Sequence, residues 1–344
     1  MLDERDNGGS RKVAATITSI AEALSLSPST VSRALRGDAA VRADTSLRVQ
    51  EAAREMGYRR DYRGVNLRTG RTNTLSAILA AQPIMEFGDP ATMHLMQGMI
   101  AGVEGTDFNL VIQPVMGEAE QMRALRDAVE ARRAGGIIID LTRPKDDRVA
   151  YLIEAGVPFV TFGRTELATP HAFFDIDNQH AAEVATLELA RMGHRRIGLI
   201  DPPVDFLFSA QRRAGYVEAL GAAGLPYDPA LIIETQIVPA HIGPATVALL
   251  GLDDPPTAFV LPNEVSTLAA VEACRSLGRD PSAIGFVSRD GTRFFDFFVP
   301  GVSSCYYPQI EAGRALSSML VEAAEGAPVD RLQRIVRTTF VPRD

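Results

Sequence analysis

Short apolar runs alternate with longer amphipathic stretches from residue 74 to the end of the chain. Continuous apolar runs predict buried strands, and apolar residues recurring every three or four positions predict helices with one buried face. A first series has predicted strands at 75–80, 110–112, 136–139 and 158–162, and helices near 92–104, 118–133 and 146–155. A second series has strands at 197–200, 231–233, 258–261 and 284–287, and helices near 179–192, 209–223, 241–250 and 264–277. Two such series predict two α/β lobes with parallel sheets, whose strands end at a shared cleft where a ligand can bind.

Three short helical patterns precede these lobes, between Thr16 and Tyr58. Their expected buried faces are Ile17, Ile20, Ala21 and Leu24, then Val31, Ala34 and Leu35, then Thr45, Val49, Ala52, Ala53 and Met56. The tight turn Ser25-Leu26-Ser27 separates the first two, with Ser27 as a cap and Pro28 at the first helical position. Gly37 and Gly57 are expected to end the second and third helices. Two short helices joined by such a turn, with a third beneath them, predict a helix-turn-helix unit.

The outward face of the second helix then decides what this unit does. With the apolar positions inward, that face presents small or hydroxylic residues and one long donor, namely Pro28, Ser29, Thr30, Ser32 and Arg33. Such side chains can approach base edges and phosphates closely. The pattern therefore favours DNA binding, with a small helical bundle bearing an ordinary polar face as the alternative.

Charge is distributed unevenly along the chain. The formal net charge is −8, but residues 11–72 hold twelve Arg and Lys against six Asp and Glu, so the remainder after residue 72 carries about −12. A basic head on an acidic body suits a protein that touches DNA with one end only. An uneven surface without function is the alternative.

Composition and motifs exclude several other classes. With 46% hydrophobic residues the chain can fill sizeable cores, no apolar run is long enough to span a membrane, and the charged leader over residues 1–12, expected to be disordered, lacks the apolar core of a signal peptide. We therefore expect a cytoplasmic protein without a membrane partner, whose two cysteines are free thiols. No phosphate-binding loop, glycine-flanked serine or zinc-spaced Cys/His cluster occurs, so we expect no catalytic residue, metal or cofactor. An enzyme with residues on distant strand ends stays open as an alternative.

Several motifs resemble the lactose-repressor (LacI) family of transcriptional regulators. They are TVSRAL at Thr30–Leu35, EAAREMGY at Glu51–Tyr58, LRTGRTNT at Leu67–Thr74, GHRRIGLI at Gly193–Ile200, RRAGYVEAL at Arg212–Leu220, and the pairs Gln97-Gly98 and Gly313-Arg314. The resemblance covers residues 16–341. It implies a helix-turn-helix domain over 13–58, a hinge over 59–72, and a two-lobed type I periplasmic-binding-protein-like body over 73–344, with 302–306, 308–325 and 332–341 crossing between lobes. It also implies a homodimer, or a tetramer, on a palindromic double-stranded operator.

The same resemblance implies the residues that contact DNA. These are Thr16, Ser27, Pro28, Ser29, Thr30, Ser32, Arg33, Leu67 and Arg68. Leu67 matches the hinge leucine that wedges into the minor groove and kinks the DNA, and Arg68 is expected near phosphates. Arg60 in place of a usual proline and Gly64 within the hinge depart from the family pattern.

For the effector, the resemblance implies a site in the cleft formed by Gln82, Asp89, Arg164, Phe206, Phe208, Arg212, Asn263 and Arg289. Arg212 matches an arginine that the family uses to hold two ligand oxygens, and the two phenylalanines are expected against a sugar ring. Ile237 replaces a stacking aromatic, and the aspartate expected after Gly285-Phe286 is absent from the run Val287-Ser288-Arg289. The expected effector is a sugar, with a sugar acid, a phosphate or a nucleobase as alternatives. A stand-alone solute-binding protein is the rival function.

Overall fold

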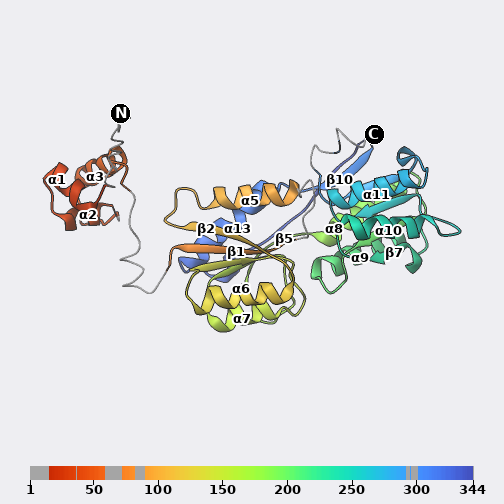
Figure 1. The fold of residues 1–344 in the computed structure, drawn as a ribbon, viewed down its shortest axis with the longest axis horizontal. Helices are drawn as coiled ribbons and strands as arrows, with labels where there is room; N and C mark the ends of the chain where they lie inside the picture. The colour runs from red at the N-terminus through yellow and green to blue at the C-terminus, as the bar shows by residue number, and fades with distance from the viewer. Residues whose placement is uncertain are drawn as a thin grey trace, which may run out of the picture. The chain divides into compact units, whose positions relative to one another are not determined.

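The computed structural model describes residues 15–35, 37–58, 72–81, 90–291, 295 and 301–343. Contacts divide the chain into two compact units, with the break between Arg71 and Thr72 (Figure 1). The leader and most of the hinge lie outside the described residues, and with them Leu67 and Arg68.

The N-terminal unit contains α1 (Ile17–Leu24), α2 (Pro28–Ala34) and α3 (Ala43–Glu55), as predicted. The first two helices begin at capping hydroxyls: the Thr16 hydroxyl accepts from the Ser19 amide at 3.1 Å, and the Ser27 hydroxyl accepts from the Thr30 amide at 3.1 Å. Gly37 and Gly57 adopt φ values of +69° and +63° after α2 and α3. Ile20, Ala21, Val31, Ala34, Val49 and Ala53 form the core. The inward prediction for Met56 is wrong, because it lies past the end of α3 and is 38% exposed.

The larger unit has two lobes, each built on one sheet. The first-lobe sheet has the order β11-β5-β4-β3-β1-β2 and is parallel throughout its described pairs. Its strands are β1 (Thr74–Ala80), β2 (Asn109–Val115), β3 (Gly136–Ile139), β4 (Phe159–Phe162), β5 (Ala172–Ile176) and β11 (Gln333–Val336). Helices α5 (Pro90–Gly102) and α13 (Gln309–Ala324) cover one face, and α6 (Glu118–Glu130) and α7 (Asp147–Ala155) cover the other (Figure 1).

The second-lobe sheet has the order β12-β10-β9-β8-β6-β7. Its strands are β6 (Ile197–Asp201), β7 (Ile232–Glu234), β8 (Ala258–Leu261), β9 (Gly285–Ser288), β10 (Val302–Tyr306) and β12 (Thr339–Val341). Helices α8 (Asn178–Arg191) and α9 (Leu207–Ala222) share one core, and α10 (Pro239–Leu250) and α11 (Glu264–Ser276) share the other. Short 3₁₀ turns lie at Pro229–Leu231, Pro281–Ala283 and Val329–Arg331. One pair departs from the all-parallel prediction, since β12 runs antiparallel to β10.

The chain passes between lobes where the sequence predicts, through β10, α13 and the β11–β12 segment. Strand β5 was not predicted, and it precedes the first passage, into α8. Helices α5 and α13 approach closely because each has a glycine that faces the backbone of the other helix. A Cβ on Gly98 would lie 1.9 Å from the Ile310 carbonyl oxygen, and one on Gly313 would lie 2.0 Å from that of Leu95.

Candidate functional site

Five of the predicted DNA-contacting residues lie on α2, with Arg33 in its last turn; Ser27 caps α2 and Thr16 caps α1. Pro28, Ser29 and Arg33 are exposed, whereas Thr30 and Ser32 are half-buried. The Ser27 hydroxyl lies 2.8 Å from the hydroxyls of both Ser29 and Thr30, so three hydroxyl groups cluster there. The Arg33 side chain is 56% exposed and its Nε lies 3.3 Å from an Asp38 carboxylate oxygen. The helix therefore presents hydroxyl groups and one guanidinium, which can bond phosphates and base edges.

A cavity of about 330 Å³ lies in the larger unit, where strands of both sheets end. Of the predicted effector residues, it is lined by Phe208, Arg212, Asn263 and Arg289. Ile237 also lines it, so the position expected to lack an aromatic does face the cavity. Gln82 and Asp89 lie outside the described residues. The volume falls at the lower end of the range typical of small-molecule sites.

Arg212 projects from α9 and is only 7% exposed. Its Nη1 donates to Asp201 at 2.8 Å and its Nε donates to Asn178 at 3.3 Å. Burial raises the pKa of the Asp201 carboxyl, against the opposing charge of Arg212. The arginine thus holds Asp201 with one edge, and two of its nitrogens are already bonded to protein oxygens.

The two predicted stacking residues are already stacked within the protein. The Phe206 and Phe208 ring centroids lie 5.4 Å apart, and the Arg212 guanidinium lies 4.6 Å from the Phe208 centroid. The Arg143 guanidinium, from the first lobe, lies 5.0 Å from the Phe206 centroid. Phe206 does not line the cavity, and its ring contacts Phe208 and the first-lobe Arg143.

Arg289 and Asp290 form a second buried pair at the cavity wall. The Arg289 Nη2 donates to Asp290 at 3.0 Å, its Nε donates to the Pro262 carbonyl at 2.9 Å, and Asp290 is 2% exposed. The run Val287-Ser288-Arg289 lacks the aspartate expected after Gly285-Phe286, but Asp290 supplies a carboxylate just beyond the end of β9. The cavity wall therefore carries a carboxylate close to the position where the family pattern has an aspartate.

The first lobe contributes two carboxylates that the sequence analysis missed. Asp140 follows β3, lines the cavity and accepts a hydrogen bond from the Ala80 amide at 2.9 Å. Burial raises its pKa to about 6. Asp175 lies on β5 and also lines the cavity, where the Arg164 Nε donates to it at 2.6 Å. Burial raises the pKa of Asp175, against the hydrogen bond from Arg164.

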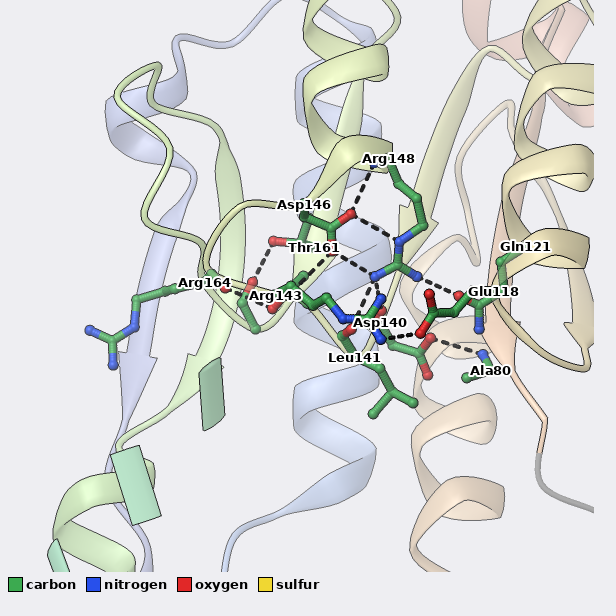
Figure 2. Close-up of polar contacts among 12 residues, drawn as sticks. Ala80, Glu118, Gln121, Asp140, Leu141, Arg143, Asp146, Arg148, Thr161 and Arg164 are labelled. Carbon is green, nitrogen blue, oxygen red and sulfur yellow. Dashed lines mark hydrogen bonds and ion pairs between the residues drawn. The ribbon is translucent and has the colours of Figure 1, made fainter. Parts of the chain in front are cut away.

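Arg164 itself does not line the cavity. Figure 2 shows its side chain directed away from the polar cluster around Arg148. Its partner, Asp175, lines the cavity instead. The signal for Asp140 was present in the sequence, as an acid directly after the apolar run of β3.

Almost every charged side chain at the cavity is paired with a side chain of opposite charge. Each arginine at or beside it has its own carboxylate: Arg212 with Asp201, Arg289 with Asp290 and Arg164 with Asp175. Asp140 is the remaining carboxylate, and it has no ion pair among the described residues. The lining therefore offers acceptors and paired cations, with a slight excess of negative charge.

None of the described helices is long and apolar enough to cross a membrane. No group of three or more His, Cys, Asp or Glu side chains in the described ranges is arranged to hold a metal ion.

Two models of known protein families match the two parts of this architecture. Residues 16–61 match the model described as bacterial regulatory proteins of the lacI family, and residues 186–344 match the periplasmic binding protein-like domain. The transcriptional regulator RafR of Escherichia coli is 30% identical over 330 residues, which cover 95% of this chain and 97% of RafR.

Two solved structures extend the match. The complex of the transcriptional regulator CelR with cellobiose is 26% identical, with a TM-score of 0.71 and coverage of 96% of this chain and 99% of CelR. The lac repressor dimer bound to operator has a TM-score of 0.74 at 20% identity, covering 96% of this chain and 98% of the repressor chain, which shows a shared fold. This chain belongs to the LacI family of helix-turn-helix transcriptional regulators.

Proposed function

We propose that this regulator is an operator-binding repressor, and that a neutral sugar bound in the cavity lowers its affinity for DNA. The observation that carries the ligand class is the pairing of every arginine at the cavity with a carboxylate. An anionic ligand such as a sugar acid or a phosphate needs cationic groups that are not already neutralised. Asp140 would in addition repel it.

The remaining groups suit hydroxyls. Asp140 and Asp175 can accept hydrogen bonds from sugar hydroxyls, and the Asn263 amide nitrogen can donate, because its Oδ1 already accepts from the Ser266 amide at 2.9 Å. Apolar lining from Phe162 and Ile237 can cover the C–H faces of a ring. The cellobiose complex of CelR, a relative 26% identical, supports the same class.

We infer that the DNA-binding species is a dimer acting in the cytoplasm on a two-fold operator. One helix-turn-helix unit reads too few bases for a specific site, and two units on one palindrome double that number. The lac repressor dimer on its operator shares this fold. We propose no chemical turnover of the ligand, and an unchanged sugar after prolonged incubation with the protein would agree with that.

A thermal-shift panel tests the ligand class. It compares cellobiose, maltose and melibiose with gluconate and glucose 6-phosphate, and with adenine and hypoxanthine. A neutral sugar at about a hundredfold excess over its Kd should raise the melting temperature by about 5–10 °C, while the anions give no shift. Stabilisation by an anion or a nucleobase alone would overturn the assignment, and failure to bind any palindromic DNA from its own upstream region would favour a stand-alone solute-binding protein.

A further inference from the structure

The segment between β3 and α7, residues 140–146, accepts several hydrogen bonds from one buried arginine. Arg148, 8% exposed, lies in the first turn of α7, and its guanidinium reaches back over this segment (Figure 2). Its Nε and Nη2 donate to the two carboxylate oxygens of Asp146 at 3.0 and 2.7 Å, and its Nη1 donates to Gln121 at 2.6 Å. The same Nη2 donates to the backbone carbonyls of Asp140 and Leu141, both at 3.0 Å.

These last two bonds involve a strained piece of backbone. Leu141 has φ of +50°, a left-handed conformation that residues with a side chain rarely adopt. Such a conformation persists only when surrounding contacts hold it. Arg148 donates to the Asp140 carbonyl, which precedes the Leu141 nitrogen, and to the Leu141 carbonyl, which follows its α-carbon. These two bonds are contacts of that kind.

The segment carries one contact to the cavity and two to the other lobe. The Asp140 carboxylate faces the cavity, the Thr142 carbonyl accepts a hydrogen bond from the Leu207 amide at 3.2 Å, and the Arg143 guanidinium lies over the Phe206 ring. Leu207 and Phe206 begin α9, the helix that carries Arg212. The conformation of residues 140–146 therefore determines both the position of the Asp140 carboxylate in the site and the contact of this segment with the second lobe.

We propose that Arg148 is a positioning residue of the effector site, which it serves without touching the ligand. By holding Leu141 in its left-handed conformation, Arg148 aims the Asp140 carboxylate into the cavity and the Thr142 carbonyl at α9. This inference rests on the proposed function for its ligand. The competing explanation is that the buried Arg148–Asp146 pair only stabilises the first lobe.

Comparison with a matched arginine separates the two explanations. Arg196 also pairs with carboxylates, those of Asp228 at 3.0 Å and Asp254 at 3.1 Å, and also donates to a backbone carbonyl, but it lies away from the cavity. Calorimetric titration with the best neutral sugar of the panel above should show binding about ten- to hundredfold weaker in Arg148→Met, the value of one lost hydrogen bond to a charged group. Arg196→Met should bind within about twofold of the parent. Equal affinities in the two variants would overturn the proposal.

Arg148→Met leaves the buried Asp146 carboxylate without its cationic partner, which can prevent folding. If the single variant does not fold, the double variant Asp146→Asn with Arg148→Met replaces it in the titration. A second test uses Leu141→Gly, because glycine adopts φ of +50° without strain. If Arg148 acts by holding Leu141, the loss of affinity in the Leu141→Gly and Arg148→Met double variant should be smaller than the product of the two single losses. Losses that multiply would mean that Arg148 acts elsewhere.

A measurement without ligand tests the positioning role of Arg148 independently of the proposed ligand class. Hydrogen exchange at the Leu207 amide, which bonds the Thr142 carbonyl, should be faster in Arg148→Met by about tenfold or more and unchanged in Arg196→Met. Unchanged exchange in both variants would refute the positioning role. If no sugar binds the parent protein, the proposed ligand class fails while this exchange result still decides the role of Arg148.

Discussion

Replacing Arg212 by Met tests whether the cavity wall depends on compensated charge. The substitution keeps much of the side-chain volume but removes the 2.8 Å partner of Asp201, which is 5% exposed. Leaving one member of a buried pair uncompensated costs about 3–5 kcal/mol. At about 2–4 °C per kcal/mol for a domain of this size, the melting temperature of the larger unit should fall by roughly 6–20 °C.

The pH dependence of this loss identifies its cause. Burial already raises the pKa of Asp201, and losing Arg212 removes a charge that lowers it. A carboxyl whose pKa is raised by folding binds more protons in the folded state than in the unfolded one, so stability rises as the pH falls through that pKa. The gap in melting temperature between Arg212→Met and the parent should therefore narrow from pH 8 to pH 5.

Scanning calorimetry at both pH values, with Asp201→Asn combined with Arg212→Met as the control, measures both effects. The double variant should recover part of the loss at pH 8, because it carries no uncompensated charge. A loss below about 2 °C in Arg212→Met, or a gap that does not change with pH, would refute the reasoning from the buried pair.

Four further predictions concern other parts of the chain. Arg33→Ala should cost roughly 1–3 kcal/mol on operator and less on random DNA in anisotropy titrations; an unchanged ratio would contradict base reading by α2. Leu67→Ala should reduce operator bending, measured by energy transfer between end labels, while leaving sugar binding intact; unaltered bending would exclude the wedge role. Because burial raises the Asp140 pKa from 3.8 to about 6, the parent should lose up to about 3 kcal/mol of stability between pH 4 and pH 7, and Asp140→Asn should lose less; parallel curves would contradict this. Gly313→Ala should destabilise by about 1–3 kcal/mol in urea unfolding, whereas Gly221→Ala, whose Cβ would meet nothing within 4 Å, should be neutral or stabilising; equal effects would refute the close packing of α5 on α13.

Much of the fold could be predicted because its signals are local. Each predicted strand of the two series has a counterpart in the structure. Six of them are largely buried and read as continuous apolar runs, whereas β2 and β7 are more exposed edge strands whose predicted apolar runs were short. Strand β5 escaped prediction because Asp175 interrupts its apolar run, and that buried carboxylate accepts hydrogen bonds from Arg164, the Ile176 amide and Asn178. The antiparallel direction of β12 depends on the path of the chain back from β11, which no local pattern encodes.

The site was harder to predict, because a charged side chain can bind a ligand ion only if no neighbouring residue already pairs with it, and that pairing depends on the three-dimensional structure. Arg164 and Arg212 were both predicted as ligand-binding cations, but each is bonded to an aspartate on a strand, Asp175 of β5 and Asp201 of β6. Phe206 appeared as a stacking residue for the ligand, yet its ring contacts Phe208 and Arg143. The residue types at the strand ends were enough to predict where the cleft lies. The pairing of its arginines with carboxylates could be seen only in the structure.

Control of operator affinity by a neutral sugar is the central claim, and one titration tests it directly. Fluorescence anisotropy with a labelled palindrome from upstream of the protein's own gene should be measured without ligand and with the sugar that gives the largest thermal shift. Saturating sugar should weaken operator binding by about 5- to 150-fold, the usual range of coupling between two sites, and the effect should vanish in Arg212→Met while DNA binding persists. Operator affinity that stays unchanged with a sugar that demonstrably stabilises the protein would contradict the account.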